Sequence, residues 1–485
     1  MKTLRIYNTL GRQKQDFVPL QKGKVGMYTC GPTVYSDPHI GNLRTYIFED
    51  ILRRTLEYLG YEVKHVQNIT DVGHLTSDAD TGEDKIEKSA REKRKTAWEI
   101  AEYYTKKFYS DIEKLNIEKP TIICKATEHI KEQVEFIKKI EENGYTYIIE
   151  NDGVYFDTSK LPVYGELIPN FDQSRIKPGA RVEFAVGKRN PCDFALWKFS
   201  PKDKKRDMEW DSPWGVGFPG WHIECSAMGV KYLGEVFDIH CGGVDHIPIH
   251  HTNEIAQSRA AYGKNPARYW VHVEFLQMGK EKMSKSLGNI ITLENLEKEG
   301  INPISYRYWT LTSHYRSQSV FSLDAVKAAQ KNLERLYEFI RRLLELIEEK
   351  KEEKEDTKIE DIVSKWLQEF EDYLFDDLNT PKIMALLNEI QKEVNMKIDD
   401  KSLSKADAKL IYDLFLKFDK VLGLKIDSIR LEEIPAEIKE LLAARELARK
   451  EKDFKKSDEL RNKLKELGWE VMDTPEGQKV KKITN

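Results

Sequence analysis

Apolar and polar positions follow two different periods within the first 70 residues. Segment 24–29, KVGMYT, is rich in apolar and β-branched residues and predicts a buried strand. Apolar residues then recur at helical spacing over 43–59, Gly60 predicts the end of that helix, and 61–70 predicts a second strand. This order predicts a parallel sheet, with loop 30–42 at the edge where open parallel sheets bind nucleotides.

The loop ends in the tetrapeptide His39-Ile40-Gly41-Asn42, where the helix begins. Backbone N–H groups and the positive end of the helix dipole favour a phosphate at such a position. Gly41 would let a ligand approach the backbone closely, and His39 and Asn42 can donate hydrogen bonds. A His-x-Gly triplet more often has a structural role, but its place between strand and helix favours phosphate binding.

The strand-then-glycine pattern returns in residues 236–246, VFDIHCGGVDH. It predicts another strand of the sheet, with His240, Gly243 and Asp245 at its end. These residues could form an adenosine or ribose pocket beside the tetrapeptide. An ordinary tight turn with a capping aspartate fits the same pattern.

Four scattered residues could together bind a metal ion. His250 and Glu254 are four residues apart in a segment that becomes helical, so both side chains lie on one face. With Cys30 and Cys225 they would make a tetrahedral zinc site. Spacing alone does not establish the site, because no CxxC pair is present and a single buried cysteine is more often a small core residue.

Segment 279–288, GKEKMSKSLG, predicts a cationic loop. Lys282 and Lys285 could meet a triphosphate as point charges, and the glycines on both sides would permit the loop to close. A solvated surface turn is the alternative.

Composition narrows the class of protein. Charged residues make up 33% of the chain, acidic and basic residues are interleaved, and the net charge is only −4, so charge alone does not indicate a nucleic-acid partner. Five cysteines without a CxxC pair predict a reducing compartment. The N-terminus lacks an apolar signal core, and no apolar run approaches the roughly 18 residues of a membrane span. We therefore expect a cytoplasmic protein without membrane contact.

The remaining segments differ in character. Residues 119–205 predict short strands and turns, with a hairpin around 151–153, and look like an insertion into the sheet. After Asp324 the chain predicts a bundle of about four helices that ends near Gly423. The tail predicts a helix pair with a basic face and a short strand with Trp469, and exposed basic and aromatic residues there would suit single-stranded nucleic acid.

HIGN and KMSKS, in this order, resemble the signature motifs of class I aminoacyl-tRNA synthetases. Their surroundings resemble the cysteinyl-tRNA synthetase family over nearly the whole chain. The segments that carry this resemblance are YTCGPTVYSDPHIGN, VQNITDVGHL, DSPWGVGFPGWHIECSAM, FDIHCGGVDHIPIHHTNEIAQS and MSKSLGN. DDLNTP and the tail segment ARELARKEKDF also look like parts of the family.

The resemblance implies roles for individual residues. Cys30, Cys225, His250 and Glu254 match the family's zinc ligands, and Thr70 and Trp221 match positions that line its amino-acid pocket. His39, Gly41 and Asn42 would contact ATP, Lys285 would stabilise the transition state with help from Lys282, and His240, Gly243 and Asp245 would lie beside adenosine. Asn42 stands where the signature often has a second histidine, and Cys241 where it often has glycine.

The resemblance also implies the reaction. ATP would activate L-cysteine to cysteinyl-adenylate, and the cysteinyl group would then pass to tRNA(Cys). One zinc ion per chain would select the substrate thiol, since zinc prefers a soft thiolate to a hydroxyl, and Mg²⁺ would accompany ATP. We expect a monomer.

The expected fold is a Rossmann-type α/β catalytic domain with an insertion, then a helical bundle and a small C-terminal domain. The expected ranges are catalytic 1–120 and 206–295, insertion 121–205, stem contact 296–340, tRNA-binding bundle 341–425 and anticodon recognition 426–485. A tRNA-independent cysteine ligase on the same core is one alternative, which the long tail disfavours. An inactive zinc- and RNA-binding paralogue is another, which the complete set of motif residues disfavours.

Overall fold

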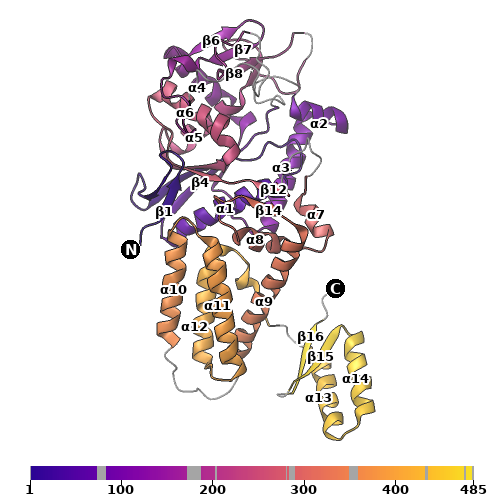
Figure 1. The fold of residues 1–485 in the computed structure, drawn as a ribbon. Coiled ribbons are helices and arrows are strands. Elements are labelled where there is room, and N and C mark those ends of the chain that lie inside the picture. Colours follow the sequence, from indigo (N-terminus) through magenta and orange to yellow (C-terminus); the bar gives the residue numbers. More distant parts are fainter. Residues whose placement is uncertain are drawn as a thin grey trace. The chain divides into compact units, whose positions relative to one another are not determined.

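A five-stranded parallel sheet lies at the centre of the first part of the chain (Figure 1). In spatial order its strands are β11 (Ala267–Val273), β10 (Phe237–Gly243), β3 (Lys24–Thr29), β4 (Glu62–Ile69) and β5 (Ile122–Lys125). From β3 the chain adds β4 and β5 on one side, and only later β10 and β11 on the other. The strand order therefore reverses between β3 and β10, and the crevice beside such a reversal is where open α/β sheets bind ligands.

The computed structural model describes residues 2–73, 84–171, 187–202, 205–279, 281–282, 290–348, 359–431, 435–474 and 477–482. These residues form two units, Met1–Ile429 and Arg430–Asn485. Among the helices described, none combines the length and apolar character needed to cross a membrane.

Helices cover both faces of the sheet because its strands present apolar side chains alternately to each face. On one face lie α1 (Ile40–Tyr58) and α3 (Ala97–Lys114), and on the other α5 (Trp221–Leu233) and α6 (Thr252–Tyr262). Val25 and Met27 of β3 pack with α1, whereas Tyr28 packs with the α5 side. Helix α1 begins at Ile40, within the tetrapeptide where the helix was expected to begin, and His39 caps it.

The insertion has its own sheet, and its bounds differ from those expected. Its antiparallel strands are β6 (Thr146–Ile149), β7 (Gly153–Phe156), β8 (Phe194–Phe199) and β9 (Gly217–Pro219), and α4 (Ile130–Glu142) packs against them. The expected start at 121 is too early, because β5 pairs with β4 of the parallel sheet. The expected end at 205 is also too early, because β9 pairs with β8. Helix α4 was not expected, although its apolar spacing is helical.

Smaller elements complete this part of the first unit. They are β1 (Arg5–Asn8) and β2 (Gln13–Asp16), α2 (Lys85–Lys93), a π-helical turn over Ile247–His251, β12 (Leu276–Met278), β13 (Glu281–Lys282), α7 (Leu293–Lys298), α8 (Pro303–Leu311) and β14 (Ser319–Phe321). The hairpin β1–β2 lies beside β11, and β12 pairs with both β13 and β14.

Four helices form the expected bundle, seen side by side in Figure 1. They are α9 (Leu323–Glu348), α10 (Ile359–Phe375), α11 (Thr380–Asp399) and α12 (Lys405–Leu422). The expected division at 340/341 falls inside α9, which is continuous, so the bundle begins with that helix. Gly423 ends α12 in the left-handed conformation, where the sequence predicted the end of the bundle.

The second unit contains α13 (Ala436–Lys450), α14 (Phe454–Glu466) and the hairpin β15 (Trp469–Thr474) and β16 (Gly477–Lys482). The expectation of an exposed Trp469 is wrong. Its side chain is 5% exposed and packs with Ile438, Leu464 and Val471, because this small unit has few other large apolar residues for a core.

A buried ion pair joins the parallel sheet's first helix to α8. Arg307 Nη2 lies 2.5 Å from Asp50 Oδ2, and both side chains are fully buried. Arg307 also donates to the carbonyl of Leu422 at the end of α12, at 2.6 Å. Burial raises the pKa of Asp50, but the charges of Arg307 and Arg54 outweigh it and lower the pKa below its usual value.

We expect Arg307→Met to reduce the free energy of unfolding by about 3–5 kcal/mol, because it leaves a buried carboxylate without its main partner. Adding Asp50→Asn should restore part of the loss. Arg341→Met, at a surface ion pair, is the control and should cost at most about 1 kcal/mol. Urea unfolding followed by circular dichroism measures all three, and a loss for Arg307→Met no larger than for the control would contradict this role.

Candidate functional site

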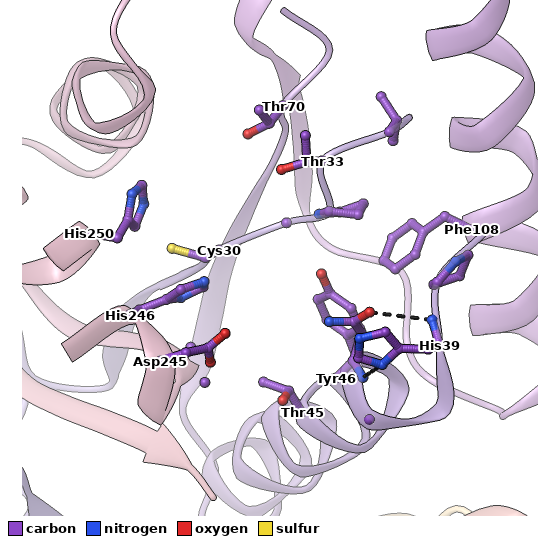
Figure 2. Close-up of a pocket in the computed structure, with 18 of the residues that line it drawn as sticks. Cys30, Thr33, His39, Thr45, Tyr46, Thr70, Phe108, Asp245, His246 and His250 are labelled. Atoms are coloured by element: carbon purple, nitrogen blue, oxygen red, sulfur yellow. Dashed lines mark hydrogen bonds between the residues drawn. The ribbon is translucent and has the colours of Figure 1, made fainter. Parts of the chain in front are cut away.

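A cavity of about 500 Å³ opens at the strand reversal (Figure 2). The ends of β3, β4 and β10, the start of α1 and residues of α3 form its walls. Gly31 follows β3 where a Cβ would collide with the carbonyl oxygen of Asn68, so the loop can pass β4 only with glycine at this position. Figure 2 shows Cys30 and His250 on one side of the cavity and His39 on the opposite side.

The tetrapeptide forms a reciprocal cap at the start of α1. His39 Nδ1 accepts a hydrogen bond from the Asn42 backbone N–H at 3.1 Å, and Asn42 Oδ1 accepts one from the His39 N–H at 3.3 Å. Since Nδ1 is the acceptor, the ring proton of neutral His39 is on Nε2. The cap thus fixes the hydrogen-bonding roles of both side chains and leaves the Asn42 amide group as a donor.

The same segment is tied to the chain that follows the lysine-rich loop. The Ile40 N–H donates to the Ile291 carbonyl at 2.9 Å, and His39 forms a β-bridge with Thr292. Lys285 lies outside the described residues, and of Lys282 only the backbone, in β13, is described. The end of this loop is therefore anchored at the start of α1.

The structure brings together the four residues that the sequence suggested as metal ligands. Cys30 follows β3, Cys225 lies in α5, His250 in the π-helical turn and Glu254 in α6. Their ligand atoms lie within 4.8 Å of one another, and all four side chains are buried. His250 Nε2 is 3.0 Å from Glu254 Oε1. Two sulfurs, an imidazole nitrogen and a carboxylate oxygen are ligands that suit tetrahedral zinc.

Burial and neighbouring charges shape the ionisation of this cluster. Burial raises the pKa of Cys225, but hydrogen bonds from Cys30 and His250 and the charge of His250 lower it to about 7. Burial and the adjacent Cys225 raise the pKa of Cys30 well above its usual value. Burial lowers the pKa of His250, yet the charges of Glu254 and Cys225 outweigh it and raise the pKa to about 10. A metal ion that binds here must therefore displace the protons of Cys30 and His250.

A second combination of donors shares Cys30 and Glu254 with the first. Cys30, His240, His251 and Glu254 also bring their ligand atoms within 4.8 Å of one another. His240 Nε2 lies 3.0 Å from Glu254 Oε2, and His251 Nε2 lies 3.3 Å from Cys30 Sγ. The sequence suggested neither His251 nor a metal-related position for His240.

Most of the other suggested residues lie in the cavity wall. They are His39, Gly41, Asn42, Thr70, Trp221, Gly243 and Asp245. The Trp221 ring lies against His250, with centroids 4.6 Å apart, and Thr70 Oγ1 donates to Glu224 at 3.0 Å. His240 is the exception, because its 1% exposed ring stacks on Trp270 and faces Glu254 and is absent from the lining of this cavity.

Further lining residues were not suggested by the sequence: Thr33, Tyr35, Tyr46, Asn68, Tyr104, Phe108 and His246. Tyr104 and Phe108 come from α3, far from the loop in sequence, and carry no local signal. The histidine-rich run that contains His246 and His250 could have indicated His246 as a site residue.

Three family models match the chain. The model of the tRNA synthetases class I (C) catalytic domain matches residues 16–331, the DALR domain matches 369–427, and the cysteinyl-tRNA ligase anticodon binding domain matches 431–480.

Known proteins are similar along nearly the full length. Cysteine–tRNA ligase 1 of Burkholderia lata is 48% identical over 98% of this chain and 96% of its own. Cysteine–tRNA ligase of Treponema denticola is 45% identical over 96% of this chain and 97% of its own. Among solved structures, Mycobacterium tuberculosis methionyl-tRNA synthetase bound by methionyl-adenylate shares the fold with a TM-score of 0.60 at 16% identity, over 84% of this chain and 93% of that one.

Proposed function

The chain belongs to the cysteinyl-tRNA synthetase family, whose members join cysteine to tRNA(Cys) with ATP, and from this we propose how its residues carry out that reaction. The observation that carries the proposal is that one cavity has a capped helix start on one side and, on the other, Cys30, Cys225 and His250 of the Cys₂-His-Glu cluster.

ATP would bind with its phosphates at the start of α1. The N–H groups of the first helical turn and the helix dipole favour the phosphates. His39 would donate through Nε2–H and Asn42 through its amide, since the cap already occupies His39 Nδ1 and Asn42 Oδ1. Gly243 and Asp245, at the end of β10, would lie beside adenosine, and Mg²⁺ would accompany the nucleotide.

L-Cysteine would bind on the opposite side, between Thr70 and Trp221. Its carboxylate would attack the α-phosphate of ATP, forming cysteinyl-adenylate and releasing pyrophosphate. A hydroxyl of the terminal adenosine of tRNA(Cys) would then attack the activated carbonyl, releasing AMP. Positioning and charge stabilisation contribute most to phosphoryl chemistry, and Lys285 with Lys282 would supply positive charge there.

Cys30, Cys225, His250 and Glu254 would hold zinc. Bound zinc supplies a soft Lewis acid, which distinguishes a thiol from a hydroxyl where an apolar pocket would discriminate poorly between near-isosteres. The chain's own part is to bury these four residues together, with Cys30, Cys225 and His250 at one wall of the cavity and Trp221 against His250, so that the amino-acid side chain would point toward them.

The C-terminal unit would recognise the anticodon. A match to an anticodon-binding domain disfavours a tRNA-independent ligase, and the complete motif set disfavours an inactive paralogue. We further propose that the chain acts as a cytoplasmic monomer, with residues 296–322, before the bundle, contacting the tRNA stem.

Asn42→Asp should preserve the helix cap but weaken ATP binding. The carboxylate can still accept from the His39 N–H, so α1 should remain intact, but it loses the donor and places negative charge at the phosphates. We expect kcat/KM for ATP in pyrophosphate exchange to fall by about 100-fold or more, since each 1.4 kcal/mol corresponds to a tenfold change. An unchanged value would exclude Asn42 from phosphate binding. Circular dichroism checks the helix content.

Lys285→Ala should lower the rate of pyrophosphate exchange by about 100-fold or more, because it removes charge that acts in the transition state. Affinity for tRNA(Cys), measured by filter binding, should stay nearly unchanged. Lys280→Ala in the same loop is the matched control. Exchange that survives in Lys285→Ala would contradict the transition-state role.

Pyrophosphate exchange with cysteine and with serine tests the whole proposal. The native chain should contain one zinc and exchange with cysteine only, and chelation should abolish this exchange. Cys225→Ser should lose the metal and discriminate poorly against serine, whereas Cys192→Ser, outside the cluster, should retain both properties. A Cys225→Ser variant that retains zinc and selectivity would refute the zinc site, and absence of exchange in the native chain would refute the activity.

A further inference from the structure

A chain of three hydrogen bonds leads from the N-terminal hairpin to Cys30. Thr9 Oγ1 lies 2.8 Å from His272 Nδ1, His272 Nε2 lies 2.7 Å from His251 Nδ1, and His251 Nε2 lies 3.3 Å from Cys30 Sγ. All four side chains are buried, with exposures of at most 8%. The steps of the proposed reaction use none of the three outer residues.

The hairpin is fixed to the edge strand that carries His272. The Thr9 N–H donates to the Trp270 carbonyl at 2.9 Å, and the Trp270 N–H donates to Asn8 Oδ1 at 2.9 Å. Asn8 Nδ2 also donates to the Arg268 carbonyl. These bonds hold Thr9 beside Trp270 of β11, two residues before His272 in the same strand. Residues 5–9 lie outside the segment 16–331 that matches the catalytic-domain model.

The chemistry of a thiolate determines the direction of every bond in the chain. A thiolate can only accept, so His251 must carry its proton on Nε2 when Cys30 is a metal ligand. A neutral His251 then accepts at Nδ1 from His272 Nε2–H. His272 in turn accepts at Nδ1, and the donor there is the Thr9 hydroxyl, 2.8 Å away. Each donor therefore points toward the Cys30 sulfur, and each hydrogen bond uses a different proton.

We propose that Thr9, His272 and His251 form the outer hydrogen-bonding shell of the metal site, and that Thr9 is its terminal positioning residue. The chain orients the Cys30 sulfur and fixes the tautomer of His251, as partners of metal ligands do in general. Without the Thr9 hydroxyl, His272 Nδ1 would be left buried without a donor, and the tautomer that His251 needs would lose its support. This inference rests on the proposed metal-binding role of Cys30.

The test compares near-isosteric variants in the full-length chain. Thr9→Val removes the hydroxyl while keeping the shape of the side chain, and Thr9→Ser keeps the hydroxyl. Thr55→Val is the matched control, because Thr55 is also buried and its hydroxyl donates to the Ile51 carbonyl within α1, away from the cluster. His272→Phe removes the middle of the chain. Circular dichroism establishes that each variant is folded before the metal is measured.

Two measurements report on the metal site independently of activity. Competition with a chromogenic chelator gives the Kd for Zn²⁺, and the Co²⁺-loaded protein gives the thiolate-to-metal charge-transfer band. We expect Thr9→Val to bind Zn²⁺ about tenfold more weakly and His272→Phe about 10–100-fold more weakly, both with a shifted band. Thr9→Ser and Thr55→Val should stay within about twofold of the native chain.

Two results would overturn the inference, and they are distinguishable. If Thr9→Val matches Thr55→Val in Kd and band position, the metal site stands but the outer shell does not. If the native chain does not bind Zn²⁺, the proposed metal site fails, and the inference with it.

Discussion

The reversal of strand order between β3 and β10 is the constraint on which the rest of the site depends. Adjacent parallel strands whose connections run to opposite sides leave a crevice at their carboxyl ends. Cys30 and the loop to α1 leave from β3, while Gly243 and Asp245 leave from β10. The two halves of the cavity therefore face each other because β3 pairs with β10, and the Cys30 N–H donates to the Cys241 carbonyl at 3.2 Å.

The start of α1 has two structural tasks at one position. His39 and Asn42 close the helix by a reciprocal cap, and that cap also determines which atoms remain as donors. The Ile40–Ile291 hydrogen bond links this helix start to the chain after the lysine-rich loop. A helix terminus needs partners for its free N–H groups. Here one of these partners is the Ile291 carbonyl, in a segment far from α1 in the sequence.

The candidate metal cluster gathers acidic groups that burial disfavours. Cys30, Cys225 and Glu254 are buried together. His240 and His250 each place Nε2 3.0 Å from an oxygen of Glu254, and His251 Nε2 lies 3.9 Å from it. The outer residues Thr9, His272 and His251 continue this arrangement with uncharged donors and acceptors. A site with so many buried polar groups is stable only when nearly all of them are hydrogen-bonded or bind a cation.

Local patterns in the chain were sufficient for β3, α1 and β4, for the end of the bundle at Gly423 and for the motif residues, because periodicity, caps and glycines act over a few residues. They failed where pairing partners are distant: β5 and β9 are four and three residues long, and only their pairing with β4 and β8 assigns them to a sheet. Trp469 shows the same limit, since the local sequence does not determine whether the tertiary structure buries a given apolar side chain. The candidate metal ligands could be suggested from the sequence alone. Their approach to within 4.8 Å, the contact of His240 with Glu254 and the link from Thr9 to Cys30 arise from the packing of β3, β10, β11 and α6. Long-range strand pairing brings residues more than 200 positions apart into contact, and no local propensity encodes that distance.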